Sequence, residues 1–211
     1  MTTYSSDNPL SRNVQPSRST RLRDAEKSFE HHLRETGPYI LAGLGVSSAI
    51  FILGNKNIPQ FNIPILSSAA DRVAYALRYT GIEGLSLVTA IHCVIGTQNY
   101  FSVHDPNDEK SNEHVQATQR NLTNTVEQFV AFQAGKLALA SISEQSALRL
   151  LPSLSAVWLL GRIAYHACIL YPSRMFGFTL NQAALFTAYG YFLYRLFASG
   201  IHSNLLPFSL R

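Results

Sequence analysis

The chain is poor in charged residues and in cysteine. Asp, Glu, Lys and Arg make up 14% of its 211 residues, whereas 46% are hydrophobic, and this balance favours a membrane protein over an ordinary soluble domain. Cys93 and Cys168 are the only cysteines, and each lies in an apolar run without a partner at metal-ligand spacing. Neither a disulfide framework nor a zinc site is therefore expected, and we assign no metal.

The chain also has little excess charge of one sign. Its net charge is +4, and the basic residues of the first 36 positions are interspersed with acidic ones rather than gathered in a stripe. Nucleic acid is therefore not an expected partner. The first apolar run begins near Pro38, after a long hydrophilic stretch. We expect no cleavable signal peptide and expect the first membrane helix to serve as the insertion signal.

Long apolar runs are what the sequence does contain. They are close to the roughly 20 residues that span a bilayer as a helix, and there are five of them: 38–54, 81–103, 117–142, 152–171 and 178–199. A short surface helix over 23–36, interrupted by Gly37 and Pro38, and an amphipathic lead-in over 67–79 are also expected. The predicted division is a polar, largely disordered tail (1–36), an extra transmembrane helix and loop (37–80), a four-helix membrane domain (81–200) and a short C-terminal tail (201–211).

The arginine-rich N-terminal tail sets the expected orientation, because positively charged segments stay on the cytosolic side of membranes. Five crossings then place the polar turn at 104–116 and the turn at 172–177 in the cytosol, and the C-terminus on the opposite side. Polar residues at the start of the third segment and at the end of the fourth would therefore gather near the cytosolic face.

Five such polar residues stand where charge is costly. At about 100° per residue, Arg120, Asn124 and Glu127 share one helix face, and Arg162 and Tyr165 lie inside the next segment. An ionised group inside a membrane helix costs roughly 2.5–3.5 kcal/mol, so these side chains must face a bundle interior or a wet cavity. Two arginines, a carboxylate, an amide and a phenol together suit a small zwitterion that bears carboxylates.

Structural interpretations of the same residues remain open. Arg120 is equally consistent with an interfacial arginine that extends toward water, and Glu127 with an ion pair to Arg120 or Arg162 that fixes helix register. Arg174 stands in a cytosolic turn, where positive charge is ordinary.

His166 shares the face of Arg162 and suits either a hydrogen-bonded core histidine or a support for that arginine. Lys136 and Gln133 lie on the side of their helix opposite Arg120 and are expected to face a neighbouring helix or subunit.

Three motifs in order carry a family resemblance over about residues 80–200. They are Arg120-x-x-x-Asn124-x-x-Glu127, then Trp158-Leu-Leu-Gly161-Arg162-x-x-Tyr165, then Arg174-Met-Phe-Gly177-Phe178. With these motifs on consecutive apolar segments, the chain resembles the membrane-associated proteins in eicosanoid and glutathione metabolism, the MAPEG family.

The resemblance implies an all-α integral membrane bundle with a four-helix core that assembles as a homotrimer, preceded here by one extra N-terminal transmembrane helix. It also implies glutathione bound between subunits near the cytosolic face, held by Arg120, Asn124, Glu127, Arg162 and Tyr165. Arg174 would stabilise the thiolate, since a nearby cation lowers a thiol pKa. The expected substrate is a lipophilic electrophile or a lipid hydroperoxide that enters from membrane lipids, and the expected location is the endoplasmic reticulum or Golgi.

Departures from the family pattern leave a second function open. Ile169 stands where several family enzymes carry a second tyrosine, and residues 98–104 lack the basic side chains often found there. The extra first helix is similar to the mattrin-like branch of the family. The alternative function is thus a non-catalytic membrane scaffold or adaptor in trafficking or quality control.

Overall fold

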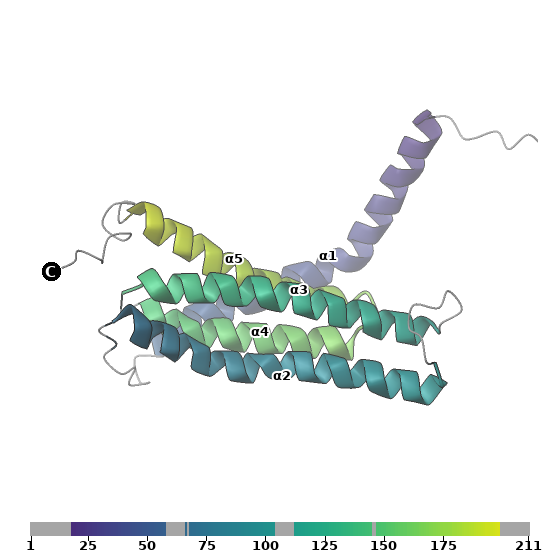
Figure 1. Cartoon of the computed structure of the whole chain (residues 1–211). Coiled ribbons are helices and arrows are strands. Elements are labelled where there is room, and N and C mark those ends of the chain that lie inside the picture. The colour runs from purple at the N-terminus through teal and green to yellow at the C-terminus, as the bar shows by residue number, and fades with distance from the viewer. Residues whose placement is uncertain (1–17, 58–65, 67, 104–111, 145–146, 199–211) are drawn as a thin grey trace, which may run out of the picture. The chain divides into compact units, whose positions relative to one another are not determined.

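The structure is a computed structural model that describes residues 18–57, 66, 68–103, 112–144 and 147–198. In these ranges it is helical and contains no strand, in agreement with the predicted all-α class (Figure 1). The elements are α1 (Arg18–Asn57), α2 (Ala69–Phe101), α3 (Glu113–Ile142), η2 (Ala147–Arg149), α4 (Leu150–Ala167) and α5 (Arg174–Ala198). The tail before Arg18, the loops at 58–65 and 104–111, and the predicted C-terminal tail at 201–211 lie outside the described residues.

Helix α1 corrects the predicted break at Gly37 and Pro38. The short helix expected over 23–36 and the apolar segment 38–54 belong to one helix of 40 residues, with Pro38 inside it. Pro38 cannot donate to the carbonyl of Arg34 and its ring crowds that carbonyl, but its fixed φ is that of a helix, and helical structure is present on both sides of it. The chain divides into two units, Met1–Glu35 and Thr36–Arg211.

Helix α2 begins twelve residues before the predicted segment at 81–103, because the lead-in at 67–79 forms its first turns. Ser68 and Asp71 form a capping box: the Asp71 amide donates to Ser68 Oγ over 3.0 Å, and the Ser68 amide donates to Asp71 Oδ2 over 3.3 Å. Helix α3 begins at Glu113 with Asn112 as its N-cap, which accepts from the His114 amide over 2.9 Å. Capping residues thus set where α2 and α3 begin. Hydropathy alone had predicted a later first residue for each helix.

The turn after α4 lies four residues earlier than predicted. Helix α4 ends at Ala167 rather than at 171, and α5 begins at Arg174 rather than at 178. Two backbone bonds close the turn, from the Tyr171 amide to the Cys168 carbonyl over 2.9 Å and from the Arg174 amide to the Tyr171 carbonyl over 3.1 Å. Arg174 is therefore the first residue of a helix. Pro152 lies in the first turn of α4, where a proline costs no helical hydrogen bond.

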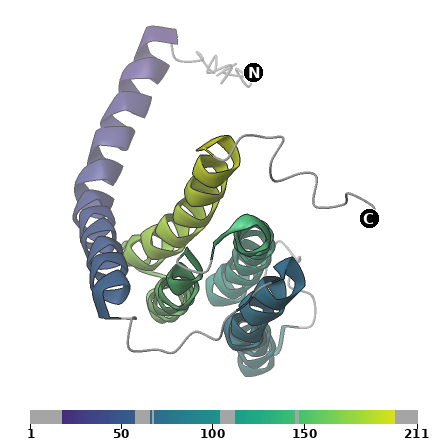
Figure 2. The same ribbon diagram turned by 90° about the vertical axis from the view of Figure 1, so that its left-hand side faces the viewer.

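Helices α2 to α5 form a four-helix bundle in which α2 and α5 each lie beside α3 and α4 (Figures 1 and 2). Phe132 of α3 and Trp158 of α4 meet across its centre, with stacked rings 4.6 Å apart and both side chains fully buried. Helices α2 and α3 are antiparallel, since Arg72 of α2 bonds the carbonyls of Ala140 and Ser141 at the far end of α3. Helices α3 and α4 are also antiparallel, since Arg162 near the end of α4 bonds Asn124 and Thr125 in the first half of α3. Consequently α2 and α4 run in the same direction.

Glycines allow two close helix approaches. A Cβ on Gly177 of α5 would fall 2.5 Å from the carbonyl oxygen of Gly161 in α4, so only two glycines allow this crossing. Beside it, Asn181 Nδ2 donates to the Trp158 carbonyl over 2.8 Å. On the other side of α5, a Cβ on Gly43 of α1 would lie 2.9 Å from Cβ of Thr179, which shows how closely the later part of α1 approaches α5.

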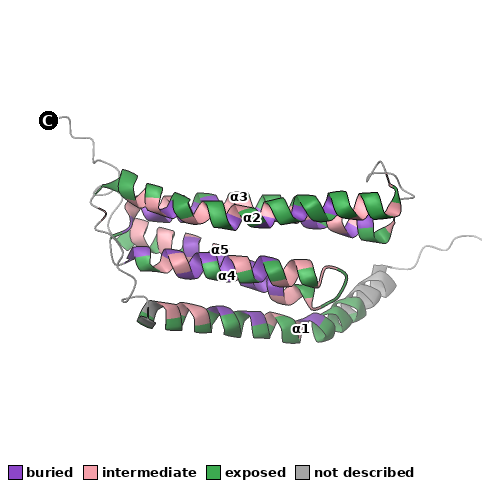
Figure 3. Ribbon diagram, turned by 90° about the horizontal axis from the view of Figure 1, so that it is seen from below, coloured by how far each residue is buried: buried purple, intermediate pink, exposed green. Residues whose placement is uncertain are grey.

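Three described helical segments are long and apolar enough to cross a membrane: Lys27–Gly54, Ala69–Phe101 and Ala147–Ala167. Their outward faces carry exposed aliphatic side chains, among them Leu41, Leu85 and Ile163 (Figure 3). A large exposed apolar surface of this kind suits lipid rather than water. The chain is an integral membrane protein.

Candidate functional site

Helix α3 presents two polar faces to different surroundings. Asn121, Thr125 and Gln128 are buried toward the bundle, whereas Arg120 and Glu127 are exposed on the outer side. Asn124 lies between the two faces and is half-buried. The face predicted from helical spacing is thus the outer one, and a second, inward polar face adjoins it.

Arg162 of α4 is the centre of the inward site. Its side chain is 1% exposed, and its guanidinium donates three hydrogen bonds to α3. Nη1 donates to Asn124 Oδ1 over 3.3 Å and to Thr125 Oγ1 over 3.2 Å, and Nη2 donates to Gln128 Oε1. All three acceptors are neutral, so the bonds satisfy donors without neutralising the charge.

Two aromatic rings complete the surroundings of this cation. The guanidinium carbon lies 4.7 Å from the centroid of the Trp158 ring and 5.8 Å from that of Tyr165. Aromatic faces attract a cation electrostatically, more strongly when water is excluded. The site is therefore a buried guanidinium that contacts two side-chain amides, one hydroxyl and two aromatic rings. One of its N–H groups, at Nε, has no acceptor among the described residues.

The structure brings together three of the six predicted site residues. Arg162 contacts both Asn124 and Tyr165, while Arg120 and Glu127 remain exposed on the adjoining outer face. No ion pair within the described part of the chain involves Glu127. Arg174 is exposed at the start of α5, where Nη1 donates to the carbonyl of Ile169 over 3.1 Å.

His166 lies one turn beyond Arg162 and extends the inward site. Its Nδ1 is 2.5 Å from Nδ2 of Asn121, so this buried asparagine joins α3 to α4 as Thr125 and Gln128 do. From the sequence His166 was a candidate for this site, but Asn121, Thr125 and Gln128 were not. Asn121, Thr125 and Gln128 are four and three residues apart, so the sequence places them on one helix face. Small polar residues occur on exposed and on buried helix faces, however, so the spacing alone did not mark them as a site.

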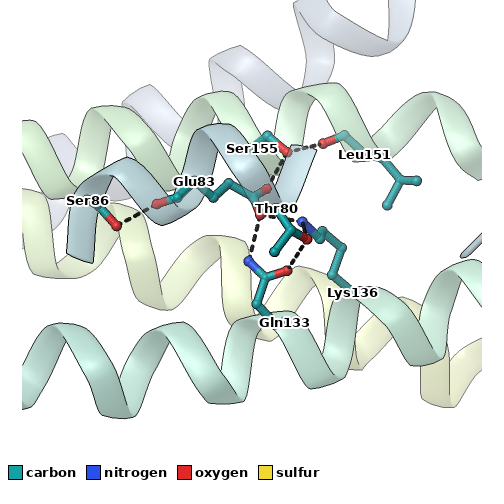
Figure 4. A network of polar contacts seen from close by, with 7 residues as sticks. All are labelled: Thr80, Glu83, Ser86, Gln133, Lys136, Leu151 and Ser155. Carbon is teal, nitrogen blue, oxygen red and sulfur yellow. Dashed lines mark hydrogen bonds and ion pairs between the residues drawn. The ribbon is translucent and has the colours of Figure 1, made fainter. Parts of the chain in front are cut away.

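A second polar centre, which was not predicted from the sequence, lies between α2, α3 and α4 (Figure 4). Glu83 of α2 and Lys136 of α3 form an ion pair in which both side chains are 0% exposed. Gln133 Nε2 donates to Glu83 Oε2 over 2.6 Å, and Ser155 of α4 donates to Glu83 Oε1 over 2.5 Å. Thr80 accepts from Lys136 over 3.2 Å and donates to Gln133 over 2.8 Å.

In the Glu83–Lys136 network every side-chain nitrogen and oxygen atom has at least one hydrogen-bond partner, whereas Arg162 Nε has none among the described residues. Both carboxylate oxygens accept hydrogen bonds, and the three donors come from α3 and α4. Such a cluster fixes the register of three helices and leaves no group free for chemistry. Lys136 and Gln133 therefore face a neighbouring helix, one of the two expected surroundings. The detectable signal was one acidic residue, Glu83, in an otherwise uncharged apolar segment and a lysine deep in the next segment.

The arrangement has the chemistry of an anion receptor. Arginine, amide and hydroxyl groups provide hydrogen bonds for carboxylates, and no group of three or more His, Cys, Asp or Glu side chains that could hold a metal occurs in the described ranges. Cys93 and Cys168 are free thiols.

Comparisons with known proteins give one match. The sequence model of the MAPEG family matches residues 72–194, which is more than half of the chain and covers α2, α3, α4 and most of α5. No curated protein and no solved structure matches the chain significantly.

Proposed function

The chain belongs to the MAPEG family, and from this premise we propose that it binds glutathione and joins it through its sulfur to lipophilic electrophiles or uses its thiol to reduce lipid hydroperoxides. Arg120, Asn124, Glu127, Arg162 and Tyr165 are the proposed binding residues. The observation that carries the proposal is the contact of Arg162 with Asn124 and Tyr165, which joins residues of two separate family motifs in one place.

The chemistry of the tripeptide fits these groups. Glutathione has two carboxylates, an ammonium, two amides and a thiol, so two arginines, a carboxylate and neutral hydrogen-bonding groups complement it. Arg120 and Glu127 carry opposite charges on an exposed face of α3. In the proposed homotrimer this face meets a neighbouring subunit, and glutathione lies between the two.

Arg174 is the proposed thiolate-stabilising group. A guanidinium beside the sulfur lowers the thiol pKa and raises the fraction of nucleophilic thiolate at neutral pH. The thiolate would form a carbon–sulfur bond with the electrophile as the leaving group departs. For this role the Arg174 side chain must turn from the Ile169 carbonyl toward the sulfur.

A turnover assay tests this role. We expect the purified full-length chain to conjugate glutathione to chlorodinitrobenzene faster than buffer does. Removing the guanidinium in Arg174→Ala should lower the rate by at least about tenfold, while glutathione affinity changes by less than about threefold. Arg149→Ala, which removes an exposed arginine before α4, is the matched control. Equal loss of binding and turnover in Arg174→Ala would contradict the assignment.

One observation favours the alternative of a non-catalytic scaffold. Ile169, at the position of the second family tyrosine, lines an apolar cavity with Phe101 and Leu170, and its carbonyl engages Arg174. A scaffold of the mattrin type that acts in trafficking or quality control binds no reacting sulfur atom. It would therefore need neither a tyrosine at position 169 nor an Arg174 side chain that is free to reach a sulfur. Absence of conjugation above the buffer rate with several electrophiles would favour this alternative.

A further inference from the structure

A cavity of about 420 Å³ lies between the later part of α1 and α5, and all of its lining residues belong to the unit Thr36–Arg211. Its volume falls within the roughly 300–1,000 Å³ of typical small-molecule sites. At one end the two helices touch, because Gly43 of α1 lies against Thr179 of α5. Two of its lining residues, Leu44 and Phe186, are 48% and 68% exposed. This α1–α5 groove is therefore closed at one end and open on the outer side of the bundle.

The groove lies at membrane depth. Gly43 meets Thr179 at the closed end, and Phe51 and Thr187, each eight residues further along its helix, line the same groove, so α1 and α5 run in the same direction. The segment Lys27–Gly54 of α1 is apolar enough to span a membrane, and α5 packs along α4, which belongs to another such segment. The open side of the groove therefore meets lipid.

The groove contains hydrogen-bonding groups that the described part of the chain does not use. Ser47 and Thr179 donate to backbone carbonyls of their own helices, over 3.0 and 2.8 Å. By contrast, the side chains of Ser48 and Gln182 form no hydrogen bond within the described residues. Lipid tails provide neither donors nor acceptors, so an amide without a partner costs free energy at this depth. These two side chains favour an occupant that both donates and accepts.

The rest of the lining selects for a neutral, apolar body. None of the residues that line the groove is charged, so an ionised ligand would lose its hydration there without gaining a counter-ion. Phe51 and Phe186 line the groove from opposite helices, further from the closed end than Ser48 and Gln182. Their rings offer large apolar surfaces to a rigid partner. The matching occupant is a neutral molecule with a hydroxyl group and a rigid apolar body.

We propose that the α1–α5 groove binds a sterol, with its hydroxyl at Ser48 and Gln182 and its rings against Phe51 and Phe186. A hydroxyl both donates and accepts, so one group pairs with both side chains. Fused rings lose less conformational freedom on binding than a flexible acyl chain does. Gln182 lies eight residues after the start of α5, or about 12 Å at 1.5 Å per residue, and helical side chains lean toward the helix start. The hydroxyl therefore lies nearer the membrane surface than the rings.

Binding of tritiated cholesterol to the full-length chain in detergent tests the proposal. We expect saturable binding that unlabelled cholesterol displaces and that cholestene, which lacks the hydroxyl, and phosphatidylcholine do not. Gln182→Leu keeps the size of the side chain but removes the amide, and should weaken binding by about fivefold through the loss of a hydrogen bond. Its melting temperature should not fall, because this amide bonds nothing in the described chain. Displacement by cholestene or phosphatidylcholine as efficient as by cholesterol would overturn the proposal.

A matched pair of variants tests the position of the site. Ser48→Trp fills the groove from an exposed position of α1 and should weaken cholesterol binding by about tenfold or more. Ala49→Trp adds the same ring at the next residue, which is exposed and outside the lining, and should bind as the parent chain does. Absence of saturable binding, or equal binding by the two variants, would overturn the proposal. None of the proposed glutathione residues lines the groove, so the result is independent of the proposed thiol chemistry.

Discussion

At the scale of single residues, two cations are buried in the bundle in different ways. Lys136 is paired with Glu83, and hydroxyl and amide groups from three helices satisfy both partners. Arg162 is surrounded by neutral acceptors and aromatic rings. The first arrangement is that of a structural pair, and the second is that of a site that attracts an anion.

Removing one member of the ion pair should be costly. Lys136→Met leaves the Glu83 carboxylate buried without a cation, and we expect the free energy of unfolding to fall by about 3–5 kcal/mol. The double variant Lys136→Met, Glu83→Leu replaces the pair with apolar side chains of similar size and should recover most of that loss. Thermal unfolding in detergent measures both variants.

Glu127→Gln on the exposed face of α3 is the control for this comparison, with an expected change within about 0.5 kcal/mol. If Lys136→Met melts at the same temperature as the parent chain, the ion pair does not stabilise the fold. If the double variant is no better than the single one, the loss has a cause other than the unpaired carboxylate.

The sequence predicted the residues around Arg162 better than the ion pair. Arg162 and Tyr165 were recognised because a charge deep in an apolar segment has few explanations. Glu83 and Lys136 occur in different segments, and only the antiparallel packing of α2 on α3 brings them together. The partners Thr125 and Gln128 were missed because the inward side of α3 could not be told from the outer one before packing was known.

At the scale of elements, the crossing of α4 and α5 depends on two small residues. A methyl group on Gly177 would contact the backbone nitrogen of Tyr165 and lie 2.5 Å from the Gly161 carbonyl oxygen. Neither backbone atom can move without separating the helices. The crossing also holds Arg174, at the first turn of α5, close to the end of α4.

Gly177→Ala should therefore destabilise the bundle by about 1–3 kcal/mol, the usual cost of overpacking. Gly190→Ala in the same helix meets nothing within 4 Å and should be neutral or slightly stabilising, because alanine is the better helix former. Melting temperatures of the two variants provide the comparison. A Gly177→Ala chain as stable as Gly190→Ala would show that the two helices do not cross this closely.

The sequence predicted which segments of the chain are helical, but it did not predict the residues at which the helices begin and end. Each predicted apolar segment lies largely within one helix, because burial and lipid exposure both require apolar side chains. Ser68 and Asp71 start α2 earlier through a capping box, and Pro38 does not end α1. Caps and a tolerated proline depend on a few local hydrogen bonds, to which hydropathy is insensitive.

At the scale of the whole molecule, the family places this chain among membrane proteins. The packing of the bundle favours more membrane-crossing helices than the three described segments that are apolar enough to span. The packed helix α3 contains Arg120, Glu127 and Lys136, and α3 is not among the three segments that are apolar enough to span. Yet α3 packs antiparallel along α2, from the Phe101–His114 ring contact to the bonds of Arg72 at its other end. We therefore expect α3 to cross wherever α2 does.

Glutathione binding to the detergent-purified chain, measured by calorimetry, tests the central claim most directly. We expect saturable binding to a homotrimer, weakened by about tenfold or more in Arg120→Ala and in Glu127→Ala because each loses a charge-assisted contact, and unchanged in the exposed control Arg149→Ala. A stable, correctly folded trimer that binds no glutathione would contradict the account, and so would binding that both substitutions leave intact.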